Sequence, residues 1–368
     1  MAPFTQSLRA DERAMRLLRS AGEFASGPGV WLAIIGVGTW AAIDRTDAFV
    51  VGIVSGSILA LGALGLTLLF GVLRFAHFAH GDSMMLSAYI AFFVLTGVIF
   101  GERADTELLP WSLNDLPGAT DRIPWPGEGE LSFGYGLLLA MIPAAGFIIA
   151  VFLLLEKLVY GPLRRRGSGV EIFAIASLGI AIAMRSVILV FWGPSPRFYA
   201  PGIRPTTDLP FDVRIVTDQI FILFAAVGLA ALVYLMLYRT KLGNAMRAIA
   251  DNADLARVSG IDADRITSWT WIIGGGLVAT AGVLLALQAQ LQPKLGFVLL
   301  LPLFAATILG GIGRPHGALV GGMIVGITQE VAVTLGFISP GYKFSVAFVL
   351  LITILLLRPK GLFGGSEQ

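Results

Sequence analysis

Histidine and carboxylate side chains gather in one short stretch, RFAHFAHGD, and they raise the question of a metal site. His77 and His80 are three residues apart, so that on a helix both imidazoles would face one side, and Asp82 follows them. A structural zinc ion takes about four such ligands. No further strong ligand lies nearby, and the chain has no cysteine. We therefore expect no metal, and we interpret the stretch, with Gly81, as non-helical backbone packed against protein or a solute path.

Two other charges, Arg185 and Glu330, lie within strongly apolar runs. A charge inside the hydrocarbon region is costly, and such residues usually pair with each other or line a path. We expect these two either to form an ion pair across the helices or to face the solute. The candidate pathway residues are then His77, His80, Gly81, Asp82 and Glu330.

The chain lacks the residue groupings that catalysis requires. It contains no nucleophile beside a base, no paired carboxylates and no GxxxxGK sequence followed by Ser or Thr. We expect neither an enzyme nor a bound cofactor. If ATP drives this protein, a partner must bind and hydrolyse it.

Apolar runs of membrane-spanning length dominate the sequence. Hydrophobic residues make up 56% and charged residues 14% of the 368 positions, whereas soluble domains carry about 25% charged residues. Runs of about 17–25 apolar residues cross a bilayer as helices, and the alternation typical of barrel strands is missing. We predict an all-α, polytopic transmembrane bundle of eight to ten spans, one or two of them broken or re-entrant, at 30–43, 49–72, 83–100, 133–158, 170–192, 218–238, 269–291, 298–312, 316–336 and 343–357.

Lys and Arg residues predict the orientation of these spans. They are about twice as frequent in the loops on the N-terminal side as in the opposite loops, and cytoplasmic loops carry such an excess. We expect an inner-membrane protein with both termini in the cytoplasm and with membrane lipids around it. The proline-rich segments 101–132 and 193–217 would be periplasmic, where they cap the bundle or form a docking surface for a soluble partner.

The first 48 residues differ from the rest of the chain. A basic lead with Arg9, Arg13, Arg16 and Arg19 at helical spacing precedes an apolar run. We interpret 1–48 as this lead, either disordered or an interfacial helix, followed by an extra membrane anchor. The domain proper is expected at 49–365. Within it, Gly52-x-x-x-Gly56 and Gly322-x-x-x-Gly326 place small residues on one helix face, which predicts close helix packing.

The stretch 239–265 is the longest polar run in the second half of the chain. Its apolar positions form one helical stripe, so the segment is amphipathic. Five basic and four acidic residues leave it too mixed in charge to bind nucleic acid. Such a helix either lies on the bilayer or fits a groove of a cytoplasmic partner. The stripe consists of Leu242, Ala245, Met246, Ile249, Ala253 and Ala256.

Two motifs resemble those of one family. The first is ALGALGLTLLFGVLRFAHFAHGDSMMLSAY, from Ala60 to Tyr89, and the second, AATILGGIGRPHGALVGGMIVGITQE, follows the polar stretch and the helix from Ser268. In this order the motifs resemble the permease subunits of ABC transporters for branched-chain amino acids, over about residues 49–365. The chain departs from the family pattern at His77, where Asn is usual, and the lead and the long 101–132 loop look like additions.

The resemblance implies several partners. They are a second homologous permease, two cytoplasmic ATP-binding subunits and a periplasmic substrate-binding protein. It also implies that the loop 239–265 couples permease to ATPase, so that replacing Arg247 or deleting 244–258 should abolish uptake without preventing membrane insertion. The positions that match the family pattern in this loop are Gly243, Arg247, Ala248, Asn252, Ala256 and Gly260.

The sequence leaves the solute open. A branched-chain or related amino acid is the first expectation, and urea, short amides or small carboxylates are alternatives within the same superfamily. A stand-alone secondary transporter or channel is an alternative of another class, which would work without an ATPase.

Overall fold

The computed structural model describes residues 29–99, 106–107, 112–125, 129–200, 202–209, 213–336, 338–358 and 361–363. The basic lead with Arg9 to Arg19, expected to be disordered or an interfacial helix, and parts of the 101–132 loop lie outside these residues.

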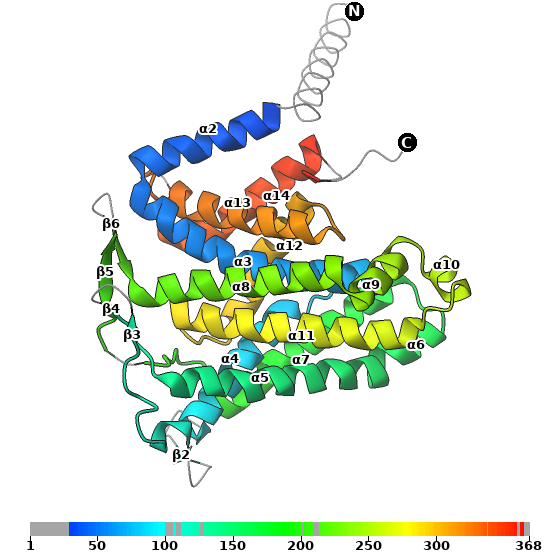
Figure 1. Ribbon diagram of the computed structural model, residues 1–368, viewed down its shortest axis with the longest axis horizontal. Helices are drawn as coiled ribbons and strands as arrows, with labels where there is room; N and C mark the ends of the chain where they lie inside the picture. Colours follow the sequence, from blue (N-terminus) through cyan, green and yellow to red (C-terminus); the bar gives the residue numbers. More distant parts are fainter. Residues whose placement is uncertain are drawn as a thin grey trace, which may run out of the picture.

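Ten apolar helices correspond, in order, to the ten predicted spans (Figure 1). Among the described residues, seven helical segments are long and apolar enough to cross a membrane, and α2, α4 and α12 are shorter. The predicted all-α, multi-pass membrane fold is therefore confirmed. The helices are α2 (Gly29–Asp44), α3 (Thr46–Leu73), α4 (His80–Thr96), α5 (Tyr135–Leu155), α7 (Val170–Trp192), α8 (Thr217–Arg239), α11 (Ala263–Gln288), α12 (Leu295–Gly310), α13 (Pro315–Val333) and α14 (Lys343–Leu357).

Short elements distinguish the two ends of the bundle. One end, which we call the hairpin end, carries the antiparallel pairs β1 (Val98–Ile99) with β2 (Thr106–Glu107), β3 (Pro124–Trp125) with β4 (Gly129–Glu130), and β5 (Thr206–Leu209) with β6 (Val213–Val216). It also holds the 3₁₀ turns η1 (Leu113–Asp115) and η3 (Pro340–Tyr342). The opposite end, the α9–α10 end, carries the π-helical turn η2 (Glu156–Tyr160), α6 (Gly161–Arg165), α9 (Lys241–Asp251) and α10 (Ala253–Val258) (Figure 1).

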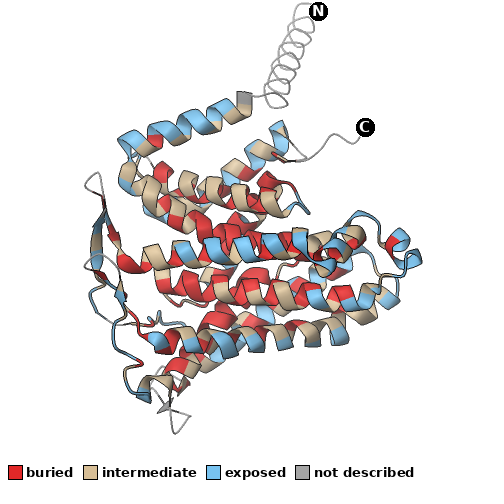
Figure 2. Ribbon diagram, in the orientation of Figure 1, coloured by how far each residue is buried: buried red, intermediate tan, exposed pale blue. Residues whose placement is uncertain are grey.

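α3 and α11 form the centre of the bundle, and the other long helices surround them. In the most apolar windows of these two helices, 72% and 78% of the residues are buried, against 22% in α8 and 11% in α14. Figure 2 shows the same contrast, with buried residues concentrated on the central helices. A helix that is apolar all round is stable either inside a protein or against lipid. The outward apolar faces of α5, α7, α8 and α14 therefore suit contact with lipid or another subunit.

Small residues bring α3 and α13 into backbone contact, as the glycine spacing predicts. A Cβ atom built on Gly326 would lie 2.2 Å from the Cα of Gly56, and one built on Gly52 would lie 2.7 Å from the Cα of Ile327. A Cβ on Gly322 would lie 2.3 Å from the Cα of Ala60. No side chain fits at these three contacts, so the glycines determine how closely the helices approach there.

We expect Gly326→Val to separate α3 from α13 and to destabilise the bundle by about 1–3 kcal/mol, the usual cost of overpacking. The measurement is thermal unfolding of the purified protein in detergent. Gly228→Val on α8 is the matched control, because a Cβ there meets no atom within 4 Å. Equal melting temperatures for the two variants would contradict the role of the glycine contact.

Candidate functional site

The turn between α3 and α4 runs back into the bundle. α3 ends at Arg74, which has a left-handed φ of 62°, and α4 begins at His80. Nε2 of His80 donates a hydrogen bond to the carbonyl of Gly62 at 2.8 Å. Gly62 lies about 18 Å before Arg74 along α3, at 1.5 Å per residue. The non-helical backbone predicted for this stretch is found at 74–79, but the prediction is wrong for His80, Gly81 and Asp82, which form the first turn of α4. The turn thus reaches deep into the bundle and is packed against protein.

His77, within this turn, lies in a cage of aromatic rings. Its ring centroid is 5.3 Å from those of Phe152 and Trp271, and the rings of Phe75 and Tyr160 complete the cage. Neither ring nitrogen has a hydrogen-bond partner among the described residues. Among the residues that the structure describes, no group of three His, Cys, Asp or Glu side chains is placed to hold a metal ion. The packing of His77 favours a role in shaping the turn over contact with a solute.

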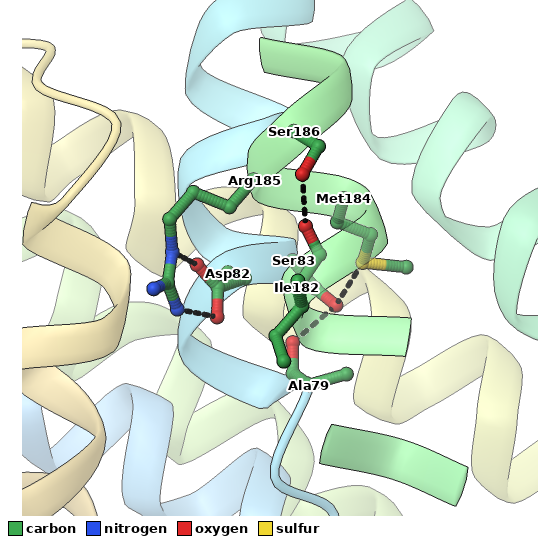
Figure 3. A network of polar contacts seen from close by, with 7 residues as sticks. All are labelled: Ala79, Asp82, Ser83, Ile182, Met184, Arg185 and Ser186. Atoms are coloured by element: carbon green, nitrogen blue, oxygen red, sulfur yellow. Dashed lines mark hydrogen bonds and ion pairs between the residues drawn. The ribbon is translucent and has the colours of Figure 1, made fainter. Parts of the chain in front are cut away.

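Asp82, just beyond the turn, forms a bidentate ion pair with Arg185 of α7 (Figure 3). Nε of Arg185 donates to Oδ1 at 2.9 Å, and Nη2 donates to Oδ2 at 2.8 Å. The carboxylate side chain is 1% exposed, and the guanidinium also lies over the ring of Phe297, 4.5 Å from its centroid. Of the two alternatives for Arg185 and Glu330, pairing with each other is therefore excluded, because Arg185 neutralises a carboxylate on the neighbouring helix α4.

Gly81 is the point at which α4 meets α12. A Cβ atom built on it would lie 2.1 Å from the carbonyl oxygen of Gly296, and one built on Gly296 would lie 2.4 Å from that of Gly81. Two helices thus begin against each other inside the bundle, which explains why both are short.

Glu330 lies in a different polar cluster, at the hairpin end. Its Oε1 accepts a hydrogen bond from the hydroxyl of Ser55 at 2.6 Å and pairs with the ammonium of Lys343. Nε2 of Gln288 donates to the Ser55 oxygen at 2.9 Å. These side chains face a cavity of about 350 Å³, which Gln329 also lines. Of the five candidate pathway residues, Glu330 is the one that lines this cavity.

The 239–265 stretch forms two short helices instead of the single helix that the stripe suggests. α9 ends at Asp251, and Asn252 caps α10 by accepting hydrogen bonds from the backbone nitrogens of Asp254 at 3.1 Å and Leu255 at 2.9 Å. Gly260, with a φ of 85°, then turns the chain towards α11. Asn252 and Gly260 therefore give the segment its bent shape.

The apolar stripe of this segment faces the protein's own bundle. Met246, Ile249 and Ala256 are 2–4% exposed and belong to the main core, and Ala248 packs against that core. The interpretation that the stripe enters a partner's groove is therefore wrong. Deletion of 244–258 would also remove these core residues, so surface substitutions test coupling more cleanly.

Two contacts connect α9 to spanning helices. A Cβ on Gly243 would lie 2.3 Å from the carbonyl oxygen of Leu237, which holds α9 tightly against the end of α8. The guanidinium of Arg74, at the end of α3, donates to the carbonyls of Ala250 and Asp251 at the end of α9. Movement of α9 would therefore pull on α3 and α8.

The outward face of this pair of helices is polar except at two positions. Leu255 is 64% and Val258 86% exposed, and they are three residues apart on α10. Arg247, on α9, is also exposed; it lies over the ring of Tyr238, 4.8 Å from the centroid, and donates to Asn244 at 2.7 Å. We call Leu255 and Val258 the apolar pair of α10.

Sequence reasoning missed several of these residues. Lys343 begins the predicted span 343–357 and is not among the expected pathway residues. Glu156, near the end of the predicted span 133–158, is not among them either; its carboxylate accepts from Nε1 of Trp271 at 2.8 Å and pairs with Arg164 at 2.6 Å. The uncharged residues Ser55 and Gln288 carried no signal of this kind.

A family model described as branched-chain amino acid transport system, permease component, matches residues 48–355. The chain belongs to this family. The resemblance seen in the two motifs is thereby confirmed, and it extends through every helix from α3 to most of α14. No solved structure matched the chain.

Named relatives cover most of the chain. The high-affinity branched-chain amino acid transport system permease protein LivH of Escherichia coli (strain K12) is 29% identical over 328 residues, which is 86% of this chain and 94% of LivH. BraD of Pseudomonas aeruginosa, a permease protein of the same description, is 29% identical over 322 residues, with the same coverage. The probable branched-chain amino acid transport permease protein LivH of Methanocaldococcus jannaschii is 29% identical over 326 residues, 85% of this chain and 90% of that protein.

Proposed function

We propose that this permease is the transmembrane subunit of an ABC importer for branched-chain or related amino acids. It lies in the bacterial inner membrane with both termini in the cytoplasm. Two separate subunits bind and hydrolyse ATP, a second homologous permease completes the pore, and a periplasmic protein delivers the solute. The permease itself catalyses no reaction. The named relatives, which align with 86% of this chain, support the solute class.

One observation carries the coupling part of this proposal. The α9–α10 end presents a folded, bent segment whose inner face is packed on the bundle and whose outer face exposes the apolar pair Leu255 and Val258. An exposed apolar pair within a polar surface suits a protein contact. Because the chain contains no phosphate-binding loop, the partner at this surface is the one that must use ATP.

The contacts of α9 suggest how the partner acts on the pore. A ligand changes a two-state equilibrium only by binding one state better. If the ATP-bound partner holds α9 in one position, Gly243 transmits that position to α8, and Arg74 transmits it to α3. α3 carries the Gly62 carbonyl that anchors His80 and the Ser55 hydroxyl that anchors Glu330. The turn around His80 and the cluster around Glu330 are thus both hydrogen-bonded to α3, the helix that α9 would move.

The family match supports the division of the chain. It covers residues 48–355, which supports the proposed permease domain at 49–365 and the proposed addition at 1–48 with the anchor α2. Within the domain, 239–265 is the coupling loop, and 101–132 and 193–217 are periplasmic.

We expect the complete assembly in proteoliposomes to import leucine only when both ATP and the binding protein are present. Radiolabelled uptake measures this, and calorimetry of the binding protein with leucine, isoleucine, valine, urea and short amides identifies the solute. Binding of urea or amides but not of the three amino acids would replace the amino-acid proposal with the urea and amide alternative. Uptake by the permease alone, driven by an ion gradient, would indicate a secondary transporter.

A further inference from the structure

We propose that the cavity at the hairpin end is a binding site for a zwitterionic α-amino acid with an aliphatic side chain. The site holds the solute between its release by the binding protein and its passage through the bundle. This inference rests on the proposed function and specifies where and how the permease recognises its solute.

The cavity has the size and the position that such a site needs. Its volume of about 350 Å³ lies within the range of about 300–1,000 Å³ found for small-molecule sites. Its walls come from α3, α8, α11, α12, α13 and α14, so it is formed between helices and not within a loop. The residues of α8 and α14 that line it stand at the hairpin ends of these helices, which is the periplasmic side in the proposed orientation.

The lining combines one positive charge and one negative charge with apolar walls. Glu330 and Lys343 pair with each other, and their side chains remain 15% and 29% exposed, so both groups are accessible from the cavity. The apolar lining consists of Val51, Ile58, Leu59, Leu285, Leu295, Leu299 and Phe344, with Ala289. A few placed polar groups in an otherwise apolar wall are typical of solute sites.

The ion pair is complementary to an amino acid. The ammonium of the solute can donate to the Glu330 carboxylate while the carboxylate of the solute accepts from the Lys343 ammonium. All four charges then have a partner of opposite sign, so binding leaves no unpaired charge near the membrane interior. A solute with a single charge would leave one member of the pair without compensation.

Neighbouring side chains hold this pair in place. The Ser55 hydroxyl donates to Glu330, and Gln288 in turn donates to Ser55. On the other side, Nε2 of Gln329 donates to the backbone carbonyl of Lys343 at 3.3 Å. Groups that are held in position before binding lose less entropy when the solute arrives.

The apolar walls select the side chain. Each buried methylene contributes about a fourfold gain in affinity, so leucine, isoleucine and valine should bind better than glycine. Urea and short amides lack both charges, and their alkyl groups are absent or small. The lining of the cavity therefore suits an aliphatic amino acid better than urea or a short amide.

A photoreactive leucine whose side chain carries a diazirine tests the site directly. On illumination the diazirine loses N₂, and the carbene inserts into a nearby bond, so the adduct marks the neighbouring residues. We expect illumination of the assembly in nanodiscs, without the binding protein, to label peptides from the cavity walls on α3, α11, α12 or α14. Leucine should prevent labelling about tenfold to a hundredfold better than 4-methylpentanoate or 3-methylbutylamine, which lack its ammonium and its carboxylate respectively.

Two variants separate solute contact from a structural role. Glu330→Gln should remove most of the preference for leucine over 4-methylpentanoate, and Phe344→Ala should make phenylalanine a better competitor without touching the ion pair. Glu130→Gln, in the exposed β4 strand, is the matched control and should change neither preference. If Glu330→Gln does not fold, the Phe344→Ala result decides.

Labelling outside the cavity, or unchanged competition in both variants, would overturn the proposed site. The proposed function would still stand if the wild-type assembly imports leucine with ATP. Absence of that uptake in the wild type would overturn both.

Discussion

Replacing both Leu255 and Val258 by Asp is expected to abolish ATP-driven uptake while the permease still folds and inserts. Both side chains are exposed, so the substitutions disturb little inside the molecule. At an interface, apolar anchors contribute about 2 kcal/mol or more each, and a buried unpaired carboxylate costs still more. We therefore expect the affinity of the ATPase subunits to fall by about a hundredfold or more. Co-purification and uptake in proteoliposomes measure the two effects.

The control for this variant uses the same substitution at the same end of the bundle. Val170 begins α7 and is 54% exposed, and the first turn of a helix tolerates an acidic residue. Val170→Asp should therefore keep normal uptake. Retained ATPase binding by the Leu255→Asp/Val258→Asp variant, with a normal melting temperature, would show that the apolar pair is not the docking surface.

Loss of ATPase binding by this variant would also show which face of the coupling segment contacts the partner. Hydrophobic periodicity identifies which positions of a helix are apolar, but it does not identify the neighbour that covers them. Met246 and Ile249 belong to the predicted stripe, yet they complete the core of their own chain. Leu255 and Val258 lie outside the stripe and remain exposed. The sequence therefore predicted an amphipathic segment correctly, and the direction in which it faces required the structure.

The partners of the intramembrane charges likewise could not be predicted from the sequence. The rule that a charge in a span needs a partner correctly directed attention to Arg185 and Glu330. It could not choose among partners far apart in the chain, because the choice depends on which helices are neighbours. α4 and α7 are in contact, so Arg185 pairs with Asp82, and Glu330 at the end of α13 pairs with Lys343 at the start of α14. The length of the apolar runs, by contrast, was sufficient to predict the ten apolar helices, although seven of the described helical segments are long enough to cross a membrane.

The Asp82–Arg185 pair provides the second large effect that we expect. Asp82→Asn would leave a guanidinium that is mostly buried without its charge partner, and breaking a buried pair in this way costs about 3–5 kcal/mol. The purified variant should unfold at a clearly lower temperature. Asp208→Asn should change the melting temperature little, because that carboxylate and its partner Arg214 are 74% and 71% exposed.

A double variant then separates stability from transport. Asp82→Leu with Arg185→Met removes both charges and keeps similar volumes, and replacing a buried pair in this way is often neutral or stabilising. We expect it to recover most of the stability that Asp82→Asn loses. If ATP-driven leucine uptake recovers as well, the pair only holds α4 against α7. If the protein is stable but uptake stays below about a tenth of wild type, its charges take part in the transport cycle. Failure of the double variant to regain stability would contradict the view that the unpaired charge causes the loss, because no charge then remains at either position.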